Sequence, residues 1–164
     1  MKRLVTSLLV LLVPGSWLCQ AAEPTSESFR VAVVAGIPQS SFKDLTSSSG
    51  FGFSAGWNFW SMSPNTNAGI YFENIWYSID SQQAVLTNVG LDMKSRIKGG
   101  FYDRFGIGAI RVKLPNEEAT TKLVGIFGIG YRFNKAFGLE IYSSSLPSSN
   151  PPASTLNMAI VWNF

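Results

Sequence analysis

The last nine residues of the chain alternate strictly between large apolar side chains and small or polar ones. The apolar positions are Leu156, Met158, Ile160, Trp162 and Phe164. Every second side chain of a β-strand lies on the same face, so a strand over 156–164 has one wholly apolar face. The other face carries Asn157, Ala159, Val161 and Asn163, which suit a confined, hydrated interior. Because the sequence ends on this strand, we expect something outside the chain to cover its apolar face.

Strand-like segments of this kind recur along the chain. Clusters of Gly, Ser, Pro and Asn separate them, and they cover 29–37, 51–60, 68–79, 85–97, 105–113, 122–133, 137–143 and 156–164. Most approach the ~9–11 residues that a tilted strand needs to cross a bilayer. Eight is the smallest even number of strands in a closed outer-membrane barrel. No helical period and no linker interrupts the series. The pattern predicts an all-β fold, a single eight-stranded antiparallel up-and-down transmembrane β-barrel.

The two faces of each segment predict which side chains point into the barrel. Over 122–133, one face carries most of the rings, and the other carries Lys122, Gly128, Gly130 and Arg132. Eight strands cannot enclose all the rings, so we expect the charged, glycine-bearing face to line a narrow lumen. In two strands, the sequence does not decide which face points toward the lipid. Asn74 falls on the outward face of 68–79, and in 105–113 two sets compete for the lipid side, namely Phe105, Ile107 and Ala109 against Gly106, Gly108 and Ile110.

The connections predict the register and the exposed features. A three-residue turn at Asn134-Lys135-Ala136 pairs Phe133 with Phe137 and sets Gly130 opposite Glu140. The other periplasmic links are expected at 61–67 and 98–104, and the outer links at 38–50, 80–84, 114–121 and 144–155. In the outer loops, Phe42 and the pair Glu117-Glu118 are expected to be exposed.

Aromatic residues gather at the predicted strand ends, which is typical of the girdles at the two faces of a membrane. Those expected at the periplasmic rim are Phe59, Trp60, Tyr131, Phe133, Phe137 and Phe164, and those at the outer rim are Phe51, Trp76, Tyr77 and Tyr142.

The first residues have the pattern of a secretory signal peptide. Lys2 and Arg3 precede an apolar run over 4–13, Pro14-Gly15 interrupts it, and small residues surround a cleavage site after Ala21 or Ala22. We expect residues 1–21 to be removed and 22–164 to form the barrel domain. The leader holds the only Cys and two of the 13 basic residues, which stand against 10 acidic ones. The mature protein is thus near neutral, and this excludes a nucleic-acid partner that requires a basic face.

The chain resembles the small eight-stranded outer-membrane barrels of the OmpA and OmpX type. The resemblance rests on the signal peptide, on 128–133 running through a short turn into 137–141, and on the final strand ending Trp162-Asn163-Phe164. It implies a bacterial outer-membrane protein in contact with lipid and lipopolysaccharide. We expect the barrel domain alone, without a periplasmic domain. The resemblance also implies that Leu156, Met158, Ile160, Trp162 and Phe164 form the signal that the barrel assembly machinery recognises.

Catalysis is not expected. Enzymes built on such barrels resemble one another in using a histidine base, and this chain has no histidine. No cofactor or metal site is expected, because the mature chain also lacks cysteine and shows no calcium-loop pattern.

The remaining constellation is a set of charges on the predicted lumen face: Arg30, Glu73, Asp92, Lys94, Arg96, Arg132 and Glu140. Paired charges would plug the barrel, and this is the favoured interpretation, with a structural or surface-interaction role. A narrow ion or small-solute channel is the first alternative, in which rearranged pairs open a path. The outer loops could bind a host or surface ligand. A secreted, soluble ligand-binding barrel is the other alternative.

Overall fold

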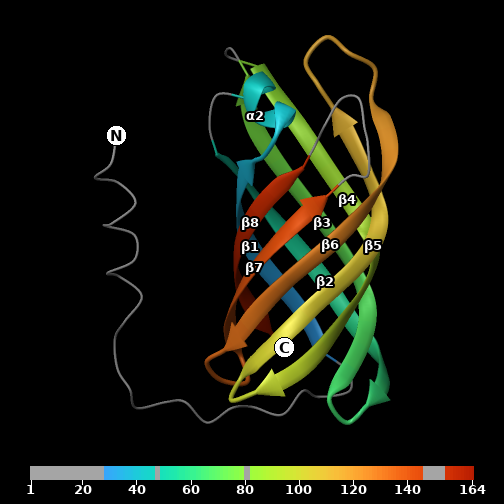
Figure 1. Cartoon of the computed structure of the whole chain (residues 1–164), viewed down its shortest axis with the longest axis vertical. Coiled ribbons are helices and arrows are strands. Elements are labelled where there is room, and N and C mark those ends of the chain that lie inside the picture. The colour runs from blue at the N-terminus through green and yellow to red at the C-terminus, as the bar shows by residue number, and fades with distance from the viewer. Residues whose placement is uncertain (1–27, 47–48, 80–81, 146–153) are drawn as a thin grey trace, which may run out of the picture.

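The computed structural model describes residues 28–46, 49–79, 82–145 and 154–164, which form a closed barrel (Figure 1). Its strands are β1 (Ser28–Pro38), β2 (Gly50–Ser63), β3 (Thr66–Ile79), β4 (Gln82–Lys98), β5 (Phe101–Lys113), β6 (Thr120–Arg132), β7 (Phe137–Ser145) and β8 (Thr155–Asn163). Each strand pairs antiparallel with its sequence neighbours, and β8 pairs with β1. The predicted fold class is confirmed. The proposed leader, residues 1–21, lies outside the described residues.

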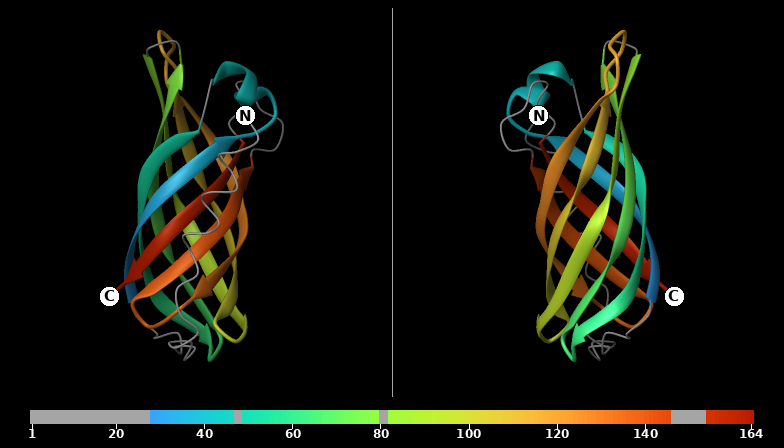
Figure 2. Two further views of the ribbon diagram at one scale, coloured as in Figure 1. Left: turned by 90° about the vertical axis from the view of Figure 1, so that its left-hand side faces the viewer. Right: turned by 90° about the vertical axis from the view of Figure 1, so that its right-hand side faces the viewer.

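The barrel has two unlike ends (Figure 2). At the terminus end, β1 begins, β8 ends, and short turns join β2 to β3, β4 to β5 and β6 to β7. At the loop end lie the other connections and one short helix, α2 (Ser41–Leu45). Within the described part of the chain, no helix is long and apolar enough to cross a membrane.

Side chains alternate between lumen and outer wall as the sequence predicts. In β6 the exposed and buried positions alternate from Leu123 to Gly130, and the register pairs Gly130 with Glu140 as expected. The two ambiguous strands are resolved. Asn74 lies on the outer wall, where its side-chain oxygen accepts a hydrogen bond of 2.7 Å from the Thr87 hydroxyl. In β5, Phe105 and Ile107 are exposed on the outer wall and Ile110 is buried in the lumen.

The connection between β4 and β5 is much tighter than the expected link over 98–104, and this prediction was wrong. β4 continues to Lys98 and β5 begins at Phe101. Gly99 and Gly100 alone make the turn, with φ angles of 59° and 89°. Two residues with positive φ fit the twist of adjacent strands, and glycine adopts them without strain. The alternation of β5 therefore starts four residues earlier, which directs the Arg104 side chain into the lumen.

The interior of the loop half is filled by apolar side chains, here called the loop-end core. It consists of Ala32, Val34, Phe42, Tyr71, Ile75, Tyr77, Ala84, Leu86, Ile110, Val112, Leu114, Val124, Ile126, Tyr142, Ala159 and Val161. Most of these residues stand on lumen-facing positions of the strands. Buried apolar side chains therefore occupy this half of the narrow lumen.

Helix α2 closes this core from above. Its Phe42 is 0 % exposed, and its ring meets the Tyr77 ring edge-on at a centroid distance of 5.1 Å. The prediction that Phe42 is exposed was wrong, because a helix of five residues leaves no periodic trace in the sequence. Tyr77 and Tyr142 were also wrongly assigned to the outer girdle. Both occupy positions whose parity points inward, and each is 1 % exposed.

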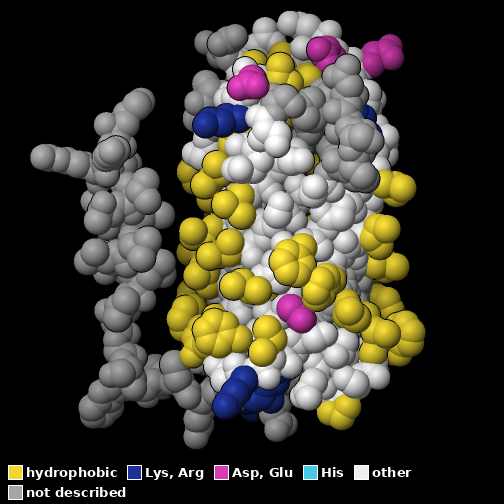
Figure 3. All heavy atoms as spheres, viewed as in Figure 1, with side chains coloured by type: hydrophobic (Ala, Val, Ile, Leu, Met, Phe, Trp, Pro, Cys, Tyr) yellow, Lys and Arg dark blue, Asp and Glu magenta, His cyan; other side chains and the backbone are white. Residues whose placement is uncertain are grey.

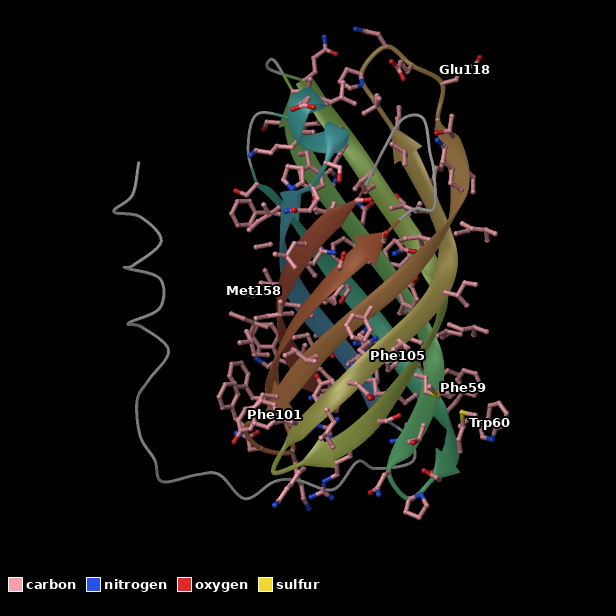
Figure 4. All side chains as sticks on the ribbon, viewed as in Figure 1. Phe59, Trp60, Phe101, Phe105, Glu118 and Met158 are labelled. Carbon is pink, nitrogen blue, oxygen red and sulfur yellow. The ribbon has the colours of Figure 1, made fainter. Side chains whose placement is uncertain are left out.

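The outer wall carries large exposed apolar side chains along its height (Figure 3). At the terminus end, aromatic rings lie next to one another around the wall. The distances between ring centroids are 4.6 Å for Phe101–Tyr131, 5.1 Å for Tyr131–Phe133, 5.4 Å for Phe133–Phe137 and 6.1 Å for Phe137–Trp162. Phe59 and Trp60 extend outward at the same end (Figure 4). Toward the loop end, Phe51 and Trp76 are exposed. Both ends of the outer wall therefore carry aromatic rings, as expected.

The contribution of the helical cap can be measured. We expect Phe42→Ala to lower the free energy of unfolding by about 3 kcal/mol, because it removes a fully buried ring from a packed core. Urea unfolding of the refolded barrel in lipid measures this. Leu45→Ala removes an exposed side chain of the same helix and serves as the control. Equal effects of the two substitutions would contradict the assignment of Phe42 as a core residue.

Candidate functional site: the charged lumen

Below the loop-end core, four strands place charged side chains at one level of the lumen. This charge cluster consists of Arg30 on β1, Asp92 and Lys94 on β4, Arg104 on β5 and Glu140 on β7. All five occupy inward positions of their strands and are buried. A glycine makes room for them, since a Cβ on Gly56 of β2 would lie 2.5 Å from Nε of Arg30. Alternation and a small neighbour thus bring together charges that are distant in the sequence.

The Glu140 carboxylate is the centre of the cluster. Arg104 Nη1 donates to its Oε2 at 3.0 Å, and Arg30 Nη1 donates to its Oε1 at 3.2 Å. The Tyr102 hydroxyl donates to Oε1 at 2.7 Å, and Lys94 Nζ donates to the same oxygen. Four donors on three strands therefore converge on one carboxylate.

Asp92 and Glu73 complete the charge balance. Asp92 accepts a hydrogen bond of 2.9 Å from Arg104 Nε and another from Arg30. Glu73 on β3 accepts a hydrogen bond from the Tyr142 hydroxyl. The guanidinium of Arg104 lies 4.5 Å from the centre of the Tyr142 ring, so this tyrosine connects Glu73 to the cluster.

Three cations thus stand near three carboxylates in the buried interior of the lumen. Isolated charges are costly in such a place, and the ion pairs offset this cost, although Arg30 Nε, Asp92 Oδ1 and Arg104 Nη2 have no hydrogen-bond partner among the described residues. The arrangement fits a rigid, electrically balanced plug.

The structure separates the predicted lumen charges into two groups. Arg30, Asp92, Lys94 and Glu140 meet in the charge cluster, and Glu73 joins them through Tyr142. The other two, Arg96 and Arg132, are only half-buried and line a small cavity at the terminus-end mouth.

Sequence reasoning missed Arg104, because the β4–β5 link was expected to include it. The sequence does contain a signal for its inward position. Phe101 and Phe105 share the outer face and Tyr102 and Arg104 share the inner face, so the alternation of β5 extends back to Gly99 and Gly100.

The chemistry of the site is limited. The sequence contains no histidine, so no imidazole base is available. Across the described ranges, no group of three or more acidic, cysteine or histidine residues could hold a metal ion. The carboxylates of the charge cluster are occupied by arginine, lysine and tyrosine donors. The geometry of the charge cluster therefore supports closure of the lumen.

The dependence of the cluster on its central carboxylate can be tested. We expect Glu140→Gln to lower the free energy of unfolding by about 3 kcal/mol, because three buried cations lose a charged acceptor. Urea unfolding in lipid measures it. Glu117→Gln, at an exposed position of the loop end, makes the same chemical change and should leave stability nearly unchanged. A fully stable Glu140→Gln barrel would show that the cluster does not hold the lumen together.

No family model and no curated protein matches the sequence. The structure is similar to the N-terminal β-barrel domain of Pseudomonas aeruginosa OprF, with a TM-score of 0.56 and 12% identity, over 84% of this chain and 97% of that one. It is similar to the Yersinia pestis outer membrane protein Ail in a phospholipid bilayer nanodisc, with a TM-score of 0.56 and 13% identity, over 85% of this chain and 100% of that one. A de novo designed transmembrane β-barrel has a TM-score of 0.54 and 14% identity, over 87% of this chain and 100% of that one. The chain thus has the fold of the small eight-stranded outer-membrane β-barrels of the OmpA and OmpX type.

Proposed function

We propose that the protein is a non-catalytic β-barrel of the bacterial outer membrane, with a closed lumen and a structural or surface-interaction role. The observation that carries this proposal is the division of its side chains, apolar on the outer wall and packed or ion-paired inside. Lipid can cover such a wall, and a closed barrel leaves no strand edge unpaired in the membrane. A secreted, soluble barrel would need the opposite division, so this alternative is not favoured.

The orientation follows from the two ends. Barrels of this type have short turns on the periplasmic side, so we infer that the terminus end faces the periplasm. The aromatic rings around that end would then lie at the periplasmic interface of the outer membrane. Export by the proposed leader, residues 1–21, is part of the same proposal.

Closure of the lumen is supported by two barriers in series. An ion that enters from the periplasmic side meets the charge cluster, in which Glu140 and Asp92 are engaged by arginines. Beyond it, the ion meets the loop-end core, where Val34, Val112 and Phe42 are 0 % exposed. Rearranging the ion pairs alone would leave the second barrier in place. A structural plug is therefore favoured over a narrow channel.

The surface role would belong to the loop end. There the ends of β3 and β4 and the connection between β5 and β6 rise above the rest of the described rim (Figure 2). The tip between β5 and β6 exposes Asn116, Glu117 and Glu118. Polar side chains on a protruding hairpin are suited to contact with another surface.

Assembly would use the outer face of β8. Its side chains Leu156, Met158, Ile160 and Trp162 are exposed on the wall, and Phe164 follows the strand. β8 closes the barrel against β1, and the Phe164 amide donates to the Phe29 carbonyl at 2.8 Å. We propose that this face is what the barrel assembly machinery recognises, because it is the apolar surface beside the closing seam.

Cell fractionation tests membrane location and assembly together. With its leader, the chain is expected in the outer-membrane fraction, and the unboiled protein should migrate differently from the boiled one on a denaturing gel. Trp162→Ser should lower the inserted amount severalfold, because it removes a ring from the proposed signal. Trp57→Ser, an exposed ring on β2, should lower it much less.

A chain that remains soluble without detergent, with no shift on the gel, would refute the membrane proposal. Equal losses for Trp57→Ser and Trp162→Ser would refute the assembly role of β8. Deletion of 116–118 should leave insertion intact. If the deleted form still attaches to host cells or matrix like the wild type, the surface role of the hairpin is excluded.

A further inference from the structure

Basic side chains gather at the terminus-end rim, where Figure 3 shows dark blue side chains below the apolar wall. They are Arg96, Lys98, Arg132 and Lys135, while the acidic Glu117 and Glu118 are exposed at the opposite end. The described acid nearest to this rim in the strand register is Asp103, on the outer wall. Its carboxylate accepts a hydrogen bond of 3.0 Å from the Ser95 amide. The rim is therefore positively charged.

A cavity of about 30 Å³ opens at this rim. Three cationic side chains line it, from Lys94, Arg96 and Arg132, together with three amide side chains, from Asn58, Asn65 and Asn67. None of its lining residues is acidic. A space of this size holds about two waters, or one small polar group whose remainder extends through the open mouth. Lys94 and the Tyr102 hydroxyl donate to Glu140, so the charges that remain for the cavity are those of Arg96 and Arg132, and an anion would match them.

The two arginines of this cavity differ from those of the charge cluster. Arg30 and Arg104 each contact both Asp92 and Glu140. Arg96 and Arg132 form no ion pair with any acidic residue that the structure describes. The buried network is balanced without them, so their charges remain available at the mouth.

The backbone holds both arginines against the turns that border the cavity. The Arg96 amide donates to the Asn65 carbonyl at 2.7 Å, and the Arg132 amide donates to the Gly100 carbonyl at 2.9 Å. Gly100 has a φ angle of 89°, and a Cβ there would lie 2.8 Å from the Arg132 carbonyl oxygen. The close approach of the glycine turn thus places Arg132 beside the cavity, which Arg96 also lines.

We propose that this cavity is a phosphate-binding site, in which Arg96 and Arg132 hold the phosphate group of a phospholipid headgroup. A guanidinium donates two parallel hydrogen bonds to a phosphate, and both arginines line the same small cavity. Phe101 lines the cavity and is also half-exposed on the wall, so the site borders the lipid. The aromatic girdle lies at the level of the lipid headgroups, so headgroup phosphates are the anions nearest to the cavity. Inorganic phosphate offers the same chemistry from solution.

The headgroup source rests on the proposed membrane location, whereas phosphate binding by the folded barrel does not. The test therefore uses two probes on the refolded barrel in a non-ionic detergent, namely a short-chain phosphatidylglycerol and inorganic phosphate. Line broadening in ³¹P NMR measures the affinity for each. A heat-dependent shift on a denaturing gel verifies that every variant is folded, so failure to fold and failure to bind are distinguished.

We expect Arg96→Gln and Arg132→Gln each to weaken binding about tenfold, because each removes charge-assisted hydrogen bonds. Lys135→Gln makes the same charge change at this rim without lining the cavity, and should weaken binding less than about twofold, as expected for an exposed charge. Arginine-dependent binding of the lipid alone supports a headgroup site, and competition by inorganic phosphate supports a general phosphate site. A folded barrel that binds neither probe, or equal losses for Lys135→Gln and the two arginine variants, would overturn the proposal.

Discussion

The carboxylate of Glu140 is shared by Arg30, Lys94 and Arg104, and the charged layer of the lumen depends on this sharing. In an eight-stranded barrel, every second side chain must enter a space only wide enough for side chains. A charge in that space needs a partner from another strand, because water cannot supply one. Glu140 meets this requirement for three cations at once, and it therefore fixes the relative positions of β1, β4, β5 and β7.

The apolar and charged layers of the lumen have complementary effects. The loop-end core adds the close packing of a protein interior, with Phe42 as its cap. The charge cluster adds directional contacts between strands that are not neighbours in the sheet, such as Arg30 on β1 and Asp92 on β4. Together they account for a barrel that is filled rather than hollow. The terminus-end mouth differs, because its arginines lie outside the balanced network and face the periplasm in the proposed orientation.

Most of the barrel could be predicted from the sequence, because alternation is a local property that each strand shows by itself. The apolar face of β8 and the register at Glu140 followed directly from the spacing of residues. The assignments that failed depended on something other than spacing. Arg104 was lost with a mistaken turn, although the pair Gly99-Gly100 indicated a tight one. Tyr77 was assigned by residue type rather than by its inward parity.

Two further features of the barrel leave no local trace in the sequence. Phe42 lies in a helix shorter than two turns, and its burial is set by the strands below it. The separation of Arg96 and Arg132 from the other lumen charges depends on the height of each residue in the tilted barrel. That height follows from strand register around the whole barrel rather than from any local pattern.

Single-channel recording in a planar lipid bilayer tests the central claim, a lumen closed by two layers, most directly. The refolded wild-type barrel should show no stable conductance. Glu140→Gln should also remain closed, because the loop-end core is independent of that carboxylate. Reproducible open steps in the wild type that are abolished by Glu140→Ala or Lys94→Ala would contradict the account and identify the charge cluster as the gate of a channel.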